Sequence, residues 1–120
     1  MIETKNKIYD LEERSFKFAK DIANFCKQLP KSQANFVYSD QLIRSSSSQG
    51  ANYIEANESL SKKDFIMRMK ICRKETKECI YWLRLIEVNS ETLEQEKQSF
   101  IQEATELKKI YCAIIDKSEN

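Results

Sequence analysis

The feature that most constrains the fold is a stripe of apolar and small side chains between residues 65 and 86. Its members follow one another at alternating spacings of four and three residues, which places them on one face of an α-helix. They are Phe65, Met69, Cys72, Thr76, Cys79, Leu83 and Ile86. Such a stripe is the packing seam of an antiparallel helical bundle. It therefore predicts a core helix in this part of the chain.

Residues that build tight turns are scarce. The 120 residues include one glycine and one proline, whereas β-hairpins and β-sandwiches need many such residues. A chain of this length fits one domain, which buries about two thirds of the surface of its unfolded chain. We therefore predict a single all-α domain over residues 1–120.

Local signals divide this domain into four helices, predicted at residues 10–29, 33–58, 62–88 and 91–116. Pro30 ends the first helix, because the residue before a proline is pushed out of the α region. Ser32, Ser61 and Ser90 are the expected N-caps, since a serine hydroxyl can accept from the unpaired amides of the first turn. Short connections make consecutive helices antiparallel, so the predicted topology is an up-down-up-down four-helix bundle.

The other helices have inward faces of their own. The first helix presents Leu11, Phe18, Ile22, Phe25, Cys26 and Leu29. The last helix presents Leu93, Phe100, Ala104, Leu107, Tyr111 and Ile114. The second helix presents Phe36, Ile43, Ser47, Gly50 and Ile54. Because the centre of this second stripe is small, we expect a neighbouring helix to approach it closely.

A second apolar set lies off these stripes. It consists of Met67, Ile71, Tyr81, Trp82 and Leu85 on the third helix, with Ile101 and Ile115 on the last. Exposed apolar patches larger than a few hundred square ångströms mark interaction sites, and identical chains are the commonest partners. We expect the set on the third helix to form the interface of a homo-oligomer. The alternative is that tilted packing covers both sets within one chain.

Residues suited to catalysis or metal binding are few. The chain has no histidine, and its four cysteines, Cys26, Cys72, Cys79 and Cys112, form no CxxC pair. We expect them to be small core residues in a reducing compartment. Neither a nucleophile–base pair nor a phosphate-binding loop is visible. We therefore expect no enzymatic activity, no metal, no cofactor and no small-molecule substrate.

No apolar run approaches the roughly 20 residues that cross a bilayer. The first ten residues, MIETKNKIYD, lack the apolar core of a signal peptide. We expect a soluble cytoplasmic protein that has no membrane partner.

Polar residues on the second and third helices form a candidate network, which comprises Arg44, Asn52, Glu55, Glu75 and Glu78. Arg44 and Glu55 are eleven residues apart, about three helical turns, and therefore share a face. Buried charges cost several kcal/mol each unless they are paired. We expect these residues to fix the register of the helices, and Glu55→Ala to lose stability or the oligomer. A ligand or nucleic-acid contact and carboxylate catalysis are the alternatives.

Charge is polarised along the chain although the net charge is +1. Residues 62–84 hold eight basic and three acidic side chains, whereas residues 85–120 hold four basic and eight acidic ones. Phosphate contacts give sequence-independent, salt-sensitive affinity and need no special motif. The candidate nucleic-acid-binding residues are Lys62, Lys63, Arg68, Lys70, Arg73, Lys74 and Lys77. The alternative is a solvated helix face.

Three segments carry a resemblance to a known family. They read LEERSFKFAKDIANFCKQLP, IRSSSSQGANYIEA and SKKDFIMRMKICRKETKECIYWLRLI. Together they closely resemble the four-helix bundle family encoded within bacterial 23S ribosomal RNA intervening sequences. The resemblance covers nearly the whole chain. It implies an antiparallel four-helix bundle that assembles into a ring-like homopentamer, and no established enzymatic activity.

The accessory protein of diversity-generating retroelements resembles the same family more distantly, and its basic surface engages nucleic acid. RNA or DNA is therefore an implied partner, although this chain departs from its basic relatives in its near-neutral charge. The leading hypothesis is a non-enzymatic oligomeric scaffold that binds RNA through the third helix. The alternative is an oligomeric protein-interaction adaptor without nucleic-acid affinity, and an enzyme is the third reading.

Overall fold

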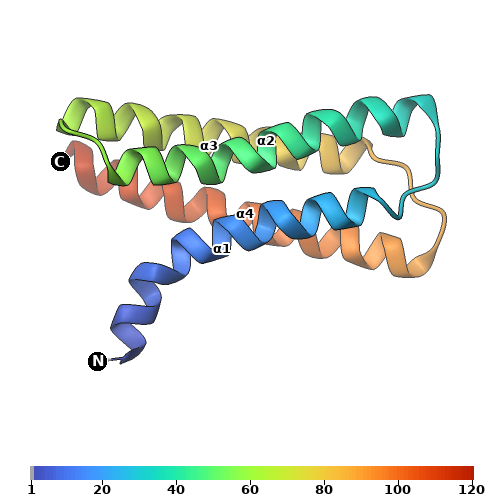
Figure 1. The fold of residues 1–120 in the computed structure, drawn as a ribbon, viewed down its shortest axis with the longest axis horizontal. Coiled ribbons are helices and arrows are strands. Elements are labelled where there is room, and N and C mark those ends of the chain that lie inside the picture. Colours follow the sequence, from blue (N-terminus) through green and yellow to red (C-terminus); the bar gives the residue numbers. More distant parts are fainter. Residues whose placement is uncertain (1) are drawn as a thin grey trace.

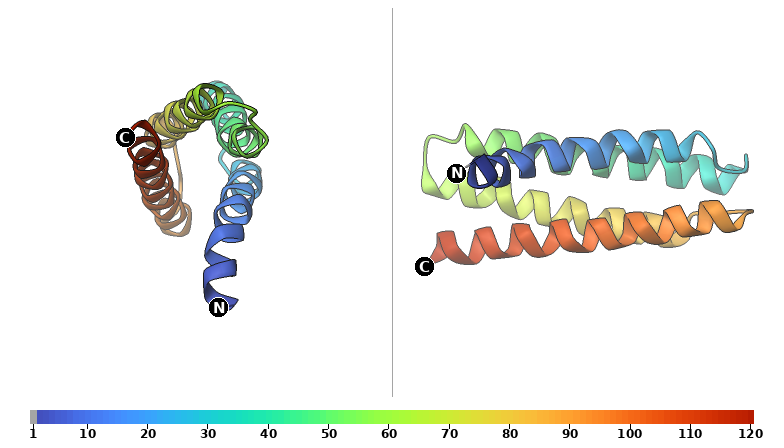
Figure 2. Two further views of the ribbon diagram at one scale, coloured as in Figure 1. Left: turned by 90° about the vertical axis from the view of Figure 1, so that its left-hand side faces the viewer. Right: turned by 90° about the horizontal axis from the view of Figure 1, so that it is seen from below.

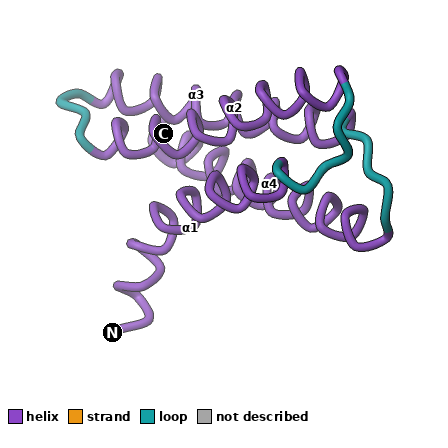
Figure 3. Tube along the Cα trace, turned by 45° about the vertical axis from the view of Figure 1, so that its right-hand side comes forward, coloured by secondary structure: helices purple, strands orange, loops and turns teal. Residues whose placement is uncertain are grey.

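Residues 2–120 form four helices in the computed structural model, which describes the backbone of these residues and the side chains of residues 11–120. The helices are α1 (Ile2–Cys26), α2 (Gln33–Asn57), α3 (Lys62–Leu85) and α4 (Glu91–Glu119). Consecutive helices run in opposite directions and are joined by short loops (Figures 1 and 3). The predicted all-α four-helix bundle is confirmed. None of the helices described is both long enough and apolar enough to span a membrane.

Viewed along the helices, the bundle is an open arc. α2 and α3 form its middle, and α1 and α4 descend from them on opposite sides (Figure 2). The first turns of α1 point away from the bundle (Figure 1). Farther along α1, Phe25 packs on Phe100 of α4 with ring centroids 5.2 Å apart. The two end helices therefore meet along only part of the length of α1.

The helix ends differ from those predicted. α1 begins eight residues before residue 10 and ends three before residue 29, α2 ends one residue early, and α4 runs three residues past residue 116. α3 ends at Leu85 because the Asn35 side chain of α2 hydrogen-bonds to the backbone that follows. Its Oδ1 accepts from the Glu87 amide at 3.0 Å, and its Nδ2 donates to the Glu87 and Pro30 carbonyls, both at 2.9 Å. Asn35 thus ties together the two loops at one end of the bundle.

The three predicted N-caps are confirmed. The hydroxyls of Ser32, Ser61 and Ser90 accept from backbone amides three residues later, at 3.0, 3.1 and 3.1 Å. All three serines have extended backbones, with φ between −140° and −153°. Each hydroxyl satisfies an amide that has no partner within its own helix.

The core matches the predicted stripes of three helices. Six of the seven residues of the α3 stripe are buried, and Phe65 packs against them half-buried. α1 buries Phe18, Ile22 and Phe25, the loop that follows it buries Leu29, and α4 buries Leu93, Ala104, Leu107 and Tyr111. Cys72 and Cys79 are fully buried in this core, which confirms the packing role predicted for them.

The predicted inward face of α2 is wrong except at Gly50. Phe36 is 62% exposed and Ile54 46% exposed, whereas the buried face consists of Asn35, Leu42, Ser45, Ser46, Gln49, Gly50 and Ala56. These polar side chains can be buried because they bond to backbone groups. Ser45 donates to the Gln41 carbonyl at 2.9 Å, for example. Gly50 does approach α1, but a Cβ at this position would still lie 3.5 Å from the Ser15 Oγ, an ordinary contact.

The prediction that Ile101 and Ile115 of α4 lie outside the core is also partly wrong. Ile115 is 1% exposed, and Ile101 packs half-buried against the core. Packing within the chain therefore covers this part of the second apolar set.

A buried polar bridge joins three helices. The Tyr111 hydroxyl of α4 donates to the Gln49 Oε1 of α2 at 2.6 Å. The Gln49 Nε2 in turn donates to the Ser15 carbonyl of α1 and to the Ser46 carbonyl, both at 2.9 Å. Burial raises the pKa of the Tyr111 phenol, so the hydroxyl keeps the proton that it donates. The bridge satisfies all the polar atoms of a side chain that is removed from water.

We predict that Gln49→Leu lowers the free energy of unfolding by about 2 kcal/mol, because the Tyr111 hydroxyl loses its buried acceptor. Tyr111→Phe should also destabilise, and the double variant should lose less than the sum of the two by 0.5 kcal/mol or more, on the order typical of contacting residues. Urea denaturation measures all three. Gln95→Leu, on the exposed side of α4, is the matched control, and additive losses would contradict the bridge.

A second prediction concerns alkaline pH. Burial raises the pKa of the Cys72 and Cys79 thiols from 9.0 to about 12. Above about pH 9 the unfolded chain releases these protons while the folded chain retains them, so stability falls as pH rises. The fall approaches about 1.4 kcal/mol per pH unit for each thiol. Denaturation at pH 7 to 10.5 should show a steeper fall for the native chain than for Cys72→Ala/Cys79→Ala, and equal slopes would contradict the assignment.

Candidate nucleic-acid interface

α3 presents a line of basic side chains to solvent. Lys63, Lys70, Lys74 and Lys77 recur at spacings of seven, four and three residues and are all exposed, so they share one face of the helix. Lys70 forms an ion pair with Glu119 of α4 at 3.0 Å. The other three form no ion pair with any side chain that the structure describes. We call these four lysines the basic line.

The remaining candidate residues lie differently. Lys62 is exposed at the first turn of α3. Arg68 instead faces α2, where its Nη1 donates to the Asn52 Oδ1 at 3.0 Å. Arg73 is half-buried. The count of local charge could not separate these groups, because it ignores the direction in which each side chain leaves the helix.

The candidate polar network divides into two parts. Arg44 donates from Nη2 to the Glu78 Oε1 at 2.8 Å and from Nη1 to the Glu75 Oε1 at 3.3 Å. Glu75 is 6% exposed, and the guanidinium compensates its buried charge. This cluster joins α2 to α3. The second part is the Arg68–Asn52 pair, in which the Asn52 Nδ2 also donates to the Ser48 carbonyl at 2.9 Å.

Glu55 joins neither part. Its side chain is exposed and forms no hydrogen bond or ion pair with the side chains described. Eleven residues separate it from Arg44, an axial distance of about 16 Å. Since α2 and α3 are antiparallel, Glu55 lies beside the start of α3, far from Glu75 and Glu78.

The sequence did not indicate a clamp that joins α1 to α4. The Arg14 guanidinium donates to both carboxylate oxygens of Glu103, at 2.7 and 2.8 Å, and to the Glu106 Oε1 at 3.0 Å. The hydrogen bond to Glu103 raises the pKa of Arg14. Arg14 and Glu103 are 89 residues apart in the chain, so no short-range spacing in the sequence indicates that they pair.

The apolar set predicted to form an oligomer interface is partly covered. Met67 is 45% exposed and Tyr81 56% exposed. Ile71, Trp82 and Leu85 are half-buried, and Trp82 stacks on Tyr38 of α2 with centroids 6.3 Å apart and an angle of 30° between the rings.

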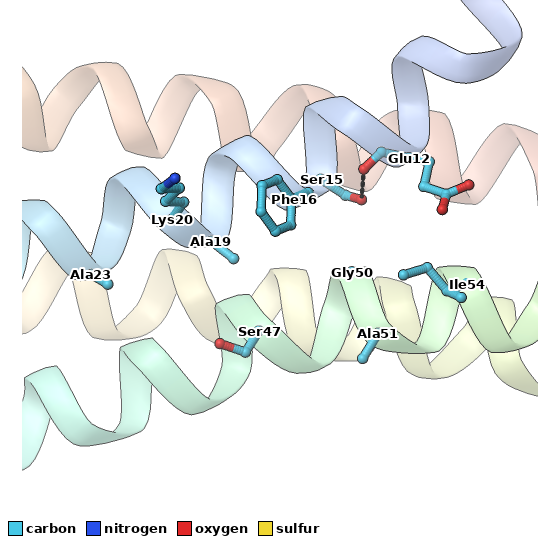
Figure 4. A pocket seen from close by; sticks show the side chains of 10 residues that line it. All are labelled: Glu12, Ser15, Phe16, Ala19, Lys20, Ala23, Ser47, Gly50, Ala51 and Ile54. Carbon is cyan, nitrogen blue, oxygen red and sulfur yellow. Dashed lines mark hydrogen bonds between the residues drawn. The ribbon is translucent and has the colours of Figure 1, made fainter.

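A separate apolar surface lies between α1 and α2. It is a groove of about 410 Å³ (Figure 4). Its lining is Glu12, Ser15, Phe16, Ala19, Lys20, Ala23, Ser47, Gly50, Ala51 and Ile54. Phe16 is 58% exposed at one wall, and Ile54 stands on the other. The sequence had suggested Ile54 for the core, so the groove could not be predicted.

These features define a small antiparallel four-helix bundle with a basic exposed face on α3 and an apolar groove between α1 and α2. Residues 7–113 match the family model of the 23S rRNA-intervening sequence protein. The chain belongs to this family, as its sequence resemblance indicated.

A solved relative has the same fold. It is the 1.70 Å crystal structure of a protein with unknown function from the S23 ribosomal protein family of Bacteroides thetaiotaomicron. The two chains are 35% identical and superpose with a TM-score of 0.79, covering 90% of this chain and 96% of the other. No curated protein matches the chain.

The two parts of the polar network lead to a prediction. Glu75→Ala should lower the free energy of unfolding by about 1–2 kcal/mol, because Arg44 then keeps one of its two carboxylate partners and its solvent exposure limits the loss. Glu55→Ala, the matched control, should change it by less than about 0.5 kcal/mol, the reverse of the expectation from sequence. Thermal and urea denaturation measure both. Equal losses would contradict the network as described.

Proposed function

We propose that this protein is a non-enzymatic oligomeric scaffold that binds RNA through the basic line of α3. The observation that carries the proposal is the set of three exposed lysines, Lys63, Lys74 and Lys77, without ion-pair partners among the described side chains. Opposite charges three or four residues apart can pair on a helix surface, but none of these three lysines forms such a pair with a described side chain. These charges are left available to phosphate groups. The name of the family, which refers to 23S rRNA intervening sequences, favours RNA as the source of the phosphates.

The dimensions of the basic line suit a nucleic-acid strand. Lys63 and Lys77 are fourteen residues apart, about 21 Å along the helix. Lysine contacts to phosphate supply affinity without reading sequence. Three contacts to single-stranded RNA predict that the logarithm of the binding constant falls with the logarithm of salt concentration with a slope of about −2 for each subunit.

Self-association supports this function in two ways. Large apolar side chains remain exposed on α1 and α2, namely Phe16, Phe36, Ile43 and Ile54, and contact with another copy would remove them from water. An oligomer also repeats the basic line once per subunit, so weak contacts act together on one RNA. The resemblance to the family makes a homopentamer the proposed assembly.

One observation favours a second function. The apolar groove between α1 and α2 combines small lining residues, such as Ala19 and Ala51, with the larger Phe16 and Ile54. A groove of this kind can accept the apolar face of an amphipathic helix. An oligomeric adaptor of this kind would recruit a protein and have no affinity for nucleic acid.

Fluorescence anisotropy of a labelled RNA, measured at several salt concentrations, separates the two functions. We predict that Lys74→Gln/Lys77→Gln weakens binding about tenfold or more at low salt and reduces the salt slope, because two phosphate contacts are lost. Lys27→Gln/Lys31→Gln removes the same charge from exposed positions in the loop between α1 and α2 and is the control.

The control should bind RNA nearly as the native chain does. Equal weakening by both pairs would show that net charge and not the basic line is responsible. A native oligomer that does not bind RNA at low salt would favour the adaptor.

A further inference from the structure

An exposed aromatic ring interrupts the basic surface of α3. Tyr81 lies four residues after Lys77 and seven after Lys74, spacings that place it on the face of the basic line. Arg84, which is also exposed, follows three residues later. The Tyr81 side chain is 56% exposed, so it contributes little to the core. A large ring therefore stands between cationic side chains on the surface proposed to meet RNA.

The neighbours of Tyr81 hold its ring in place. Its centroid lies 5.0 Å from that of Trp82, with an angle of 74° between the two planes. Trp82 is half-buried and stacks in turn on Tyr38 of α2. Edge-to-face and offset pairs of this kind are the favoured geometries of aromatic contacts. A ring that is braced in this way loses little further freedom when a ligand stacks on it.

We infer that Tyr81 is a stacking platform for an unpaired base, and that the protein prefers single-stranded RNA to duplex RNA of the same length. Proteins that bind single strands combine a basic track along the backbone with aromatic rings on which bases stack. A base inside a duplex is already stacked on its neighbours and cannot reach such a ring. Duplex RNA would therefore use the lysines alone. The inference rests on the proposed RNA binding and adds the kind of RNA.

The experiment uses one RNA of about twelve nucleotides that contains 2-aminopurine, first as a single strand and then annealed to its complement. Anisotropy measures affinity, and the fluorescence of 2-aminopurine reports stacking. The native chain should bind the single strand more tightly and quench the fluorophore. Tyr81→Phe should behave like the native chain, because it keeps the ring.

Tyr81→Ala should lose about tenfold in affinity for the single strand, the scale of one stacked base, and less than twofold for the duplex. The salt slope should not change, since no charge is removed. Val37→Ala is the control, because Val37 is exposed to a similar extent but lies on α2 and not on the basic line. Light scattering of each variant measures the mass of the assembly.

The outcomes are distinct. If the native chain binds both RNAs and Tyr81→Ala weakens neither, RNA binding stands and the stacking platform is wrong. If the native chain binds neither RNA, the proposed function itself fails. If Tyr81→Ala changes the mass of the assembly, Tyr81 is a contact between subunits, and the inference is overturned in favour of that role.

Discussion

The arrangement of the helices depends on the buried bridge that runs from Tyr111 through Gln49 to the backbone of Ser15. The arc brings α1 and α4 together along only part of α1. The bridge from Gln49, in the middle of α2, therefore adds a contact that holds both end helices in place. Buried polar atoms without partners are costly. Once Gln49 is inside, the rotation of α2 is therefore fixed by the positions of its partners on α1 and α4.

This rotation decides which surfaces the protein offers to others. With Ser45, Ser46, Gln49 and Gly50 inward, α2 leaves Ile54 and Phe36 outside, and an apolar groove forms against α1. α3 has the opposite character, because its apolar seam is buried apart from the half-buried Phe65, and lysines line its exposed face. The bundle thereby places an apolar groove between α1 and α2 and a basic line on α3.

The parts of the fold that could be predicted are those with local signals. The stripe of α3 and the three serine caps depend on residues three or four apart, and sequence periodicity records such spacings. The inward face of α2 could not be predicted, because hydropathy ranks Ile54 above Gln49, and the partners that reverse this ranking are 34 and 62 residues away.

The candidate site shows the same limit. The direction of Lys74 follows from its place on the helix, whereas the turn of Arg68 toward Asn52 and the separation of Glu55 from Arg44 depend on how α2 and α3 align.

Light scattering of the purified protein, with and without a structured ribosomal RNA fragment at low and moderate salt, tests the central claim most directly. The account predicts a stable oligomer whose mass increases by that of the RNA at low salt and returns to its own value at moderate salt. A monomer, or an oligomer whose mass the RNA leaves unchanged at low salt, would contradict the claim that this fold assembles into an RNA-binding scaffold.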